Sequence, residues 1–89
     1  MRVVVKSGAF KKDYKRIKKR GLSPDRLIAI VSLILEDQPL PERCRPHKLS
    51  GEYSGFWECH IEPDWLLIYD ITEDELSLRR TGSHADLFR

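Results

Sequence analysis

The chain has 89 residues, a length that suits one folded domain, residues 1–89, and leaves no room for a deep cofactor cavity. The composition, 40% hydrophobic and 34% charged, is that of a globular protein and excludes a disordered tail. The net charge of +2 hides an asymmetry, because residues 1–20 carry a charge of +8 and the remainder carries −6. A basic block of this kind fits a polyanion or an acidic protein partner, although a solvated Lys-rich helix face is an equally simple interpretation.

No apolar segment approaches the length of about 20 residues that a membrane-spanning helix needs. The longest apolar run is Leu27–Leu35, and the first residues do not have the layout of a signal peptide. These features predict a cytoplasmic protein without a membrane partner. In that reducing compartment Cys44 and Cys59 are expected to be free thiols.

The N-terminal segment predicts a strand and then a basic helix. Val3–Val5 is β-branched, as strands prefer, and Ser7 is a suitable N-cap for a helix that Gly21 ends. Lysines cover most of this helix. Its apolar residues recur at the spacing of one helical stripe: Phe10, Tyr14 and Ile17.

A second helix is predicted directly afterwards. Ser23 is placed as an N-cap, with Pro24 at the first helical position, and Pro39 and Pro41 prevent continuation of the helix. Apolar residues between Leu27 and Leu35 occupy a wide arc, so we expect this helix to be mostly buried.

The second half predicts a long connection followed by three strands. Residues 38–55 are rich in Pro and Gly, and an irregular loop of this length is often functional. Phe56–Ile61, Trp65–Ile71 and Glu75–Thr81 are strand-like runs with short turns between them, as in an antiparallel meander. The order β-α-α-β-β-β predicts an α+β fold, with two helices packed on one face of a small, mainly antiparallel sheet.

All three histidines lie in this second half. His47 belongs to the long connection, His60 lies near a strand end, and His84 follows the last strand. In a meander His60, Asp64 in the first turn, and His84 share one end of the sheet. Histidine exchanges protons near neutral pH, as general acid–base cleavage of RNA requires. Arg79 and Arg80 are candidate phosphate-binding cations, and Trp65 and Phe88 are candidate base-stacking residues.

Simpler interpretations apply to each of these residues. A single histidine is usually a surface or packing residue, Trp65 and Phe88 can belong to the core, and Arg80 can pair with an acidic neighbour. A zinc site built from Cys44, His47, Cys59 and His60 is a rival, but adjacent strand residues point to opposite faces. Cys59 is therefore expected to face the helices, and His60 the other side.

Three segments together resemble the YafQ branch of the RelE/ParE toxin superfamily: PHKLSG at 46–51, HIEPDWLLIY at 60–69 and RTGSHADLF at 80–88. The resemblance covers nearly the whole chain, including the basic helix. It implies a RelE-like fold and a ribosome-dependent mRNA endonuclease of the ribosomal A site that a cognate antitoxin inactivates. The antitoxin is expected to be acidic where it meets the basic face.

The resemblance also implies the roles of individual residues. His47, His60, Asp64 and His84 match catalytic positions, with His84 as general acid and either His47 or His60 as general base. Trp65 and Phe88 lie beside them, and Arg80 matches a basic position. No metal or other cofactor is expected. Four lysines of the first helix would face ribosomal RNA: Lys11, Lys12, Lys15 and Lys19.

One position departs from the pattern, because relatives commonly carry Arg where this chain has Trp57. An alternative function is that of a ParE-like toxin, which inhibits DNA gyrase on the same fold without cutting RNA. Three histidines at family positions argue against a toxin that only binds.

Overall fold

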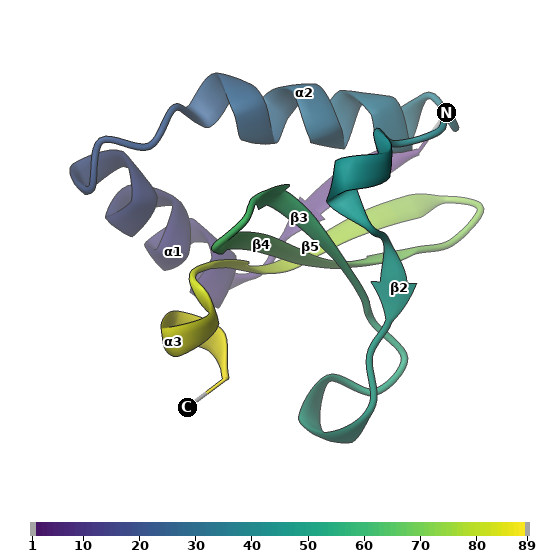
Figure 1. The fold of residues 1–89 in the computed structure, drawn as a ribbon. Helices are drawn as coiled ribbons and strands as arrows, with labels where there is room; N and C mark the ends of the chain where they lie inside the picture. The colour runs from purple at the N-terminus through teal and green to yellow at the C-terminus, as the bar shows by residue number, and fades with distance from the viewer. Residues whose placement is uncertain (1, 89) are drawn as a thin grey trace.

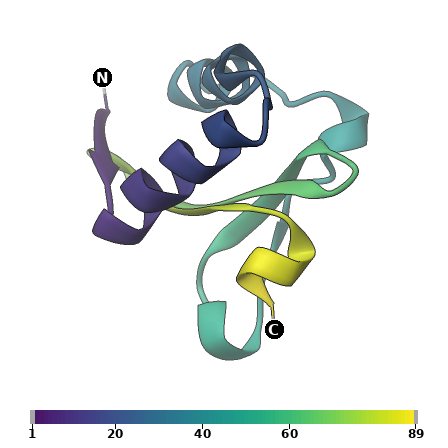
Figure 2. The same ribbon diagram turned by 90° about the vertical axis from the view of Figure 1, so that its left-hand side faces the viewer.

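The structure is a computed structural model that describes residues 2–88, and it shows a twisted five-stranded sheet with two long helices on one face (Figure 1). A one-turn helix at the C-terminal end lies beside the sheet (Figure 2). The elements are β1 (Val3–Lys6), α1 (Gly8–Lys19), α2 (Pro24–Leu35), β2 (His47–Lys48), β3 (Trp57–Glu62), β4 (Trp65–Ile71), β5 (Glu75–Gly82) and α3 (His84–Leu87).

The sheet has the order β1-β5-β4-β3-β2. All neighbouring pairs are antiparallel except β1 and β5, which are parallel. The predicted α+β fold with a mainly antiparallel sheet is therefore confirmed. In the described residues β1 and β2 are the two edge strands.

The predicted boundaries of the two long helices are confirmed. The Ser7 hydroxyl accepts a hydrogen bond from the Phe10 amide at 2.9 Å, which caps α1. Gly21 has φ of +82°, the left-handed conformation that ends a helix at little cost for glycine. Ser23 occupies the N-cap position of α2, with Pro24 following, but its side chain makes no capping hydrogen bond.

The expectation that α2 is mostly buried is wrong. Only Leu27, Ile30 and Ile34 of this helix are buried, whereas Ile28 is 52% exposed. The apolar arc is wider than the strip of α2 that faces the sheet, so one side of it lies open above β1 and α1. This open side forms part of a groove that is described below.

The connection 38–55 is more ordered than predicted. It contains two short 3-10 turns, Glu42–Cys44 and Gly51–Tyr53, on either side of the two-residue strand β2. His47 pairs with Glu58 of β3, so this histidine lies on an edge strand and not in an irregular loop. The pairing fixes the position of the His47 backbone relative to the sheet.

Alternation along β3 and β4 separates two cores. Cys59, Leu67 and the other side chains on one face pack against α1 and α2. The second 3-10 turn and α3 cover the opposite face. A smaller cluster of buried residues lies there: Tyr53, Leu66, Ile68 and Leu87. The candidate catalytic residues lie around this smaller cluster.

Side chains of α1 and its N-cap bind backbone groups of β5 beyond the end of β1. The β1–β5 pairing ends at Leu78. After that point the Ser7 hydroxyl donates to the Arg79 carbonyl at 2.7 Å, and the buried Asp13 carboxylate accepts from the Thr81 amide at 3.2 Å. These contacts satisfy backbone groups that no strand reaches, and they bring α1 beside the end of β5.

None of the helices among residues 2–88 is long and apolar enough to cross a membrane.

Candidate active site

The strand register brings His60 and His84 to the same end of the sheet. His60 pairs with Leu66, and Leu66 pairs with Gly82, which lies two residues before His84. The two imidazole ring centroids are 5.8 Å apart. The predicted convergence of the C-terminal ends of β3 and β5 is therefore observed, and Asp64 lies in the turn between β3 and β4 at this end.

Asp64 holds His84 by two hydrogen bonds. Its Oδ1 accepts a hydrogen bond from the His84 backbone amide at 2.9 Å and lies 2.7 Å from the His84 Nδ1. The hydrogen bond from the His84 backbone lowers the pKa of Asp64 most, and the bond to the His84 ring lowers it further. The carboxylate therefore stays charged at neutral pH. With Nδ1 engaged by Asp64, the Nε2 atom of the half-exposed ring is the nitrogen left for a substrate.

A buried carboxyl group, which the sequence reasoning missed, links the other two histidines. Glu58 Oε1 lies 3.4 Å from His47 Nε2 and 3.7 Å from His60 Nε2. The Glu58 side chain is 7% exposed, while the His47 ring is about half exposed and its Nδ1 lies 2.8 Å from the Arg45 carbonyl. The alternation of β3 contained the signal, because Glu58 precedes His60 by two residues and therefore shares its face.

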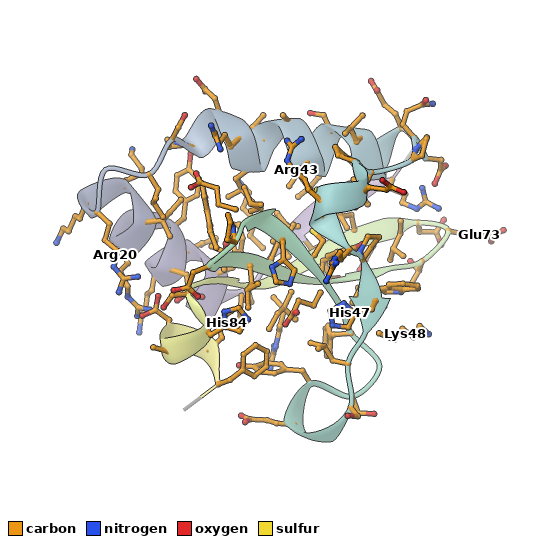
Figure 3. All side chains as sticks on the ribbon, in the orientation of Figure 1. Arg20, Arg43, His47, Lys48, Glu73 and His84 are labelled. Carbon is orange, nitrogen blue, oxygen red and sulfur yellow. The ribbon has the colours of Figure 1, made fainter. Side chains whose placement is uncertain are left out.

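Aromatic side chains close one side of this cluster. The Phe88 ring is 43% exposed; its centroid lies 6.4 Å from the His84 ring and 5.8 Å, edge-on, from the Tyr53 ring. In Figure 3 His84, on α3, and His47, on β2, both lie on the side of the sheet away from α2. The cluster is thus exposed to solvent, since His47, His84 and Phe88 are each about half exposed.

Trp65 does not lie on that surface. It is 1% exposed, belongs to the core under α1 and α2, and donates its indole N–H to the Thr81 hydroxyl at 2.9 Å. This geometry favours the core interpretation of Trp65 over base stacking. Trp57 also packs against the helix-side core, on the face opposite to His60, with the Lys48 Nζ 5.7 Å from its ring.

Arg80 is held by an acidic neighbour, the simpler of the two interpretations given above. Its guanidinium donates to both oxygens of Asp13, at 2.6 and 3.1 Å, and Nη1 donates to the Tyr53 hydroxyl at 3.3 Å. The hydrogen bonds to Asp13 raise the pKa of Arg80. The Arg80 side chain remains 22% exposed.

The lysines named above all lie on the exposed side of α1: Lys11, Lys12, Lys15 and Lys19. Arg16 and Arg20 lie beside carboxylates, although both side chains remain partly exposed. Arg20 pairs with Asp86 of α3, and Arg16 lies between Asp13 and Asp86. Figure 3 shows Arg20 extending from α1 toward α3.

The four residues of the zinc hypothesis lie on two sides of the sheet. Cys44 and Cys59 are free, fully buried thiols in the helix-side core, whereas His47 and His60 flank Glu58 on the other face. Burial raises the pKa of Cys59 to about 12, so its thiol is neutral. Within residues 2–88 no group of three or more His, Cys, Asp or Glu side chains is arranged to hold a metal ion.

Comparisons with known proteins agree with this arrangement. A family model described as the bacterial toxin of type II toxin–antitoxin system, YafQ, matches residues 2–89. The mRNA interferase toxin YafQ of Escherichia coli strain K12 is 40% identical over 83 residues, which cover 92% of this chain and 90% of that protein.

Solved structures extend the likeness to three dimensions. The crystal structure of YafQ from E. coli strain BL21(DE3) has a TM-score of 0.93 and 37% identity, and all of both chains is covered. The toxin of the E. coli DinJ–YafQ toxin–antitoxin complex has a TM-score of 0.90 and 38% identity, with 99% of this chain and 98% of that chain covered. The chain therefore belongs to the YafQ family of bacterial toxins of type II toxin–antitoxin systems, which have the RelE-like fold.

Proposed function

We propose that this protein is a ribosome-dependent mRNA endoribonuclease that works in the cytoplasm. The observation that carries the proposal is the pair of imidazole rings 5.8 Å apart, each beside a carboxyl group, at an open end of the sheet. Family membership supports it, because the E. coli relative bears the name mRNA interferase.

The reaction that two such rings support is internal transfer at a phosphodiester. A base removes the proton of the 2′-hydroxyl, the 2′-oxygen attacks phosphorus, and an acid protonates the departing 5′-oxygen, which leaves a 2′,3′-cyclic phosphate and a 5′-hydroxyl. Each proton transfer contributes roughly 10²–10⁴-fold to the rate. We assign the acid to His84, whose Nε2 is left free by the contact of Nδ1 with Asp64, and the base to His60, the histidine in ring contact with it.

The remaining residues position the substrate in this proposal. His47, on the exposed edge strand, contacts the RNA backbone. Arg80 stabilises the charge that develops on the phosphate, and the exposed Phe88 stacks on a base. The exposed lysines of α1 bind ribosomal RNA, where phosphate contacts give affinity that falls with salt.

The function is tested by primer extension on a defined mRNA after brief induction of the toxin, with translation active and with initiation blocked. The proposal predicts cuts at fixed codon positions that require translation, and loss of these cuts in His84→Gln and His60→Gln variants that still fold. Undiminished growth arrest by both variants would overturn the nuclease assignment and favour a gyrase-binding toxin.

The acid and the base are separated by a modified linkage. An mRNA with sulfur in place of the 5′-oxygen at the cleavage site, placed in the A site of a programmed ribosome, has a leaving group that needs no protonation. The His84→Gln variant is expected to cleave this mRNA at a rate near that of the unchanged protein, while His60→Gln stays slow. Equal slowing in both variants contradicts the assignment of His84.

We further propose that a cognate antitoxin docks an acidic amphipathic helix into a groove on the helix side of the molecule. This groove has a volume of about 710 Å³ and lies between β1, α1 and α2. Its walls include Phe10, Ile28 and Val31, and Lys11 and Lys15 stand on its rim. Apolar walls with a basic rim complement a helix with one apolar and one acidic face.

The docking proposal predicts a toxin that escapes its antitoxin. Ile28→Glu changes a half-exposed groove residue, so we expect an intact fold and undiminished cleavage, but binding to the antitoxin weakened at least tenfold. Ala29→Glu adds the same charge at an exposed position of α2 that does not line the groove, and serves as control. Unchanged affinity of the Ile28→Glu variant contradicts the groove as the docking site.

A further inference from the structure

The helix that carries His84 is too short to be stable alone. α3 has four residues, His84–Leu87, and a single turn of helix gains one or two backbone hydrogen bonds for the ordering of its residues. Its position therefore depends on side-chain anchors. Leu87 is buried in the smaller core, the Asp64 carboxylate accepts a hydrogen bond from the His84 amide, and Asp86 anchors the far side of the helix.

Asp86 joins α3 to α1 by a two-pronged ion pair. Arg20 Nη1 donates to Asp86 Oδ2 at 2.6 Å and Arg20 Nη2 donates to Oδ1 at 2.9 Å. The Ser83 amide also donates to Oδ2 at 2.9 Å, so the same carboxylate caps α3 and binds α1. A planar guanidinium fork fixes direction as well as distance, which a lysine does not.

The pair belongs to a network of charged side chains along one face of α1. Asp13, Arg16 and Arg20 recur at i, i+3 and i+7, the spacing of one helix face. Arg16 Nη1 lies 3.4 Å from Asp13 and 3.6 Å from Asp86. Since Asp13 also binds Arg80 and the Thr81 amide, α1 holds both the end of β5 and the start of α3.

We propose that Arg20 is a positioning residue for His84, acting through Asp86. It fixes the direction of α3 so that the His84 ring stays on Asp64 and in contact with His60. This inference rests on the proposed role of His84. It assigns Arg20, within the basic stretch of α1, to the catalytic geometry and leaves RNA contact to the exposed lysines.

The test compares three variants in single-turnover cleavage by toxin-saturated ribosome complexes. Arg20→Gln is expected to lower the cleavage rate about 10- to 100-fold without changing the concentration of half-saturation, because a small displacement of an acid is costly. Arg20→Lys, which keeps the charge and loses the fork, is expected to recover part of the rate. Arg26→Gln removes one charge from an exposed position of α2, where Arg26 pairs with Glu62, and is expected to match the unchanged protein.

A second readout separates positioning from folding and from RNA contact. The imidazole signals of His84 in heteronuclear NMR report its hydrogen bond to Asp64, and we expect them to shift in Arg20→Gln while the signals of the helix-side core stay in place. The inference is overturned by a rate within twofold of the unchanged protein. It is also overturned by a lower rate with unshifted His84 signals. If His84→Gln itself still cleaves, it is the proposed function that fails.

Discussion

At the scale of single residues, the site depends on carboxyl groups that accompany histidines. Asp64 lies in a turn and holds His84 from an exposed position, whereas Glu58 lies in a strand and approaches His47 and His60 from a buried one. A histidine is oriented by the hydrogen bond at its other nitrogen, so Asp64 leaves Nε2 of His84 for the substrate, while Glu58 lies at ion-pair distance from the other two rings.

Glu58→Gln is therefore expected to slow single-turnover cleavage by about tenfold, equivalent to about 1.4 kcal/mol of transition-state stabilisation. The amide keeps the shape of the side chain but cannot form an ion pair with the two imidazoles. Glu62→Gln, at the end of the same strand and paired with Arg26, is the matched control and should leave the rate unchanged. Indistinguishable rates for the two variants would show that Glu58 only fills space.

At the scale of elements, the junction between β5 and α3 is closely packed at Gly82. Gly82 has φ of +152°, and a Cβ at this position would lie 2.8 Å from Asp86 Oδ2 and 3.1 Å from Asp86 Cβ. Asp86 has no room to retreat because Arg20 and Ser83 hold its carboxylate. The glycine thus lets α3 begin directly at the end of the sheet.

Gly82→Ala is expected to destabilise the fold by about 1–3 kcal/mol and to slow cleavage, because the new methyl group pushes Asp86 and α3 away. Gly8→Ala serves as control. Nothing lies within 4 Å of a Cβ at Gly8, at the start of α1, and alanine there is expected to add about 0.4–1 kcal/mol of stability. Thermal denaturation and the cleavage rate measure both effects, and equal stability of the two variants contradicts the close approach at Gly82.

The ion pair between α1 and α3 also predicts how stability depends on pH. Hydrogen bonds from Arg20, and then from Ser83, hold the pKa of Asp86 far below its ordinary value of 3.8. A group whose folded pKa is depressed stabilises the fold above its unfolded pKa and loses this contribution as pH falls through the folded pKa.

We therefore expect Asp86→Asn to lower the free energy of unfolding by about 1 kcal/mol at pH 7, a modest figure because Arg20 is half exposed. The difference from the unchanged protein should shrink progressively below about pH 4, as the unfolded carboxyl group becomes protonated. Urea denaturation at pH 7, 4 and 2 measures it. A difference that stays constant over this range means that Asp86 acts only as a neutral cap.

At the scale of the whole molecule, the sheet separates a closed core from an open site. Cys44 and Cys59 mark the closed side, since both thiols are fully buried in the core that α1 and α2 cover. The histidines lie on the other side, where a short 3-10 turn and one turn of helix leave the sheet partly uncovered. Stability and chemistry are therefore assigned to different faces.

This separation predicts that neither thiol reacts with iodoacetamide while the protein is folded. Burial excludes the reagent, and the pKa of Cys59, raised to about 12, keeps the reactive thiolate scarce. Both cysteines should be alkylated at the rate of global unfolding, as mass spectrometry across a urea series would measure. Rapid alkylation of one cysteine in water would reveal local opening of the helix-side core.

Much of the fold follows from local chemistry that the sequence already contains. Ser7 and Gly21 bound the first helix through capping and a left-handed turn, and the short turns of the meander predict antiparallel pairing of the last three strands. Since a meander has one geometry at its ends, His60, Asp64 and His84 could be placed together before the structure was known. Trp65 could not be assigned, because an aromatic residue that opens a strand fits a core and a binding surface equally well.

The tertiary structure decided which partners each side chain meets. Pairing of β2 with β3 brings His47 to Glu58, and the packing of α1 against β5 directs Arg16 and Arg20 toward Asp86 while the lysines stay exposed. In the composition these arginines and lysines all contribute the same positive charge. Burial of Phe10 and Ile17 sets the rotation of α1 about its axis. This rotation alone separates the arginines that pair with Asp86 from the lysines that face outward.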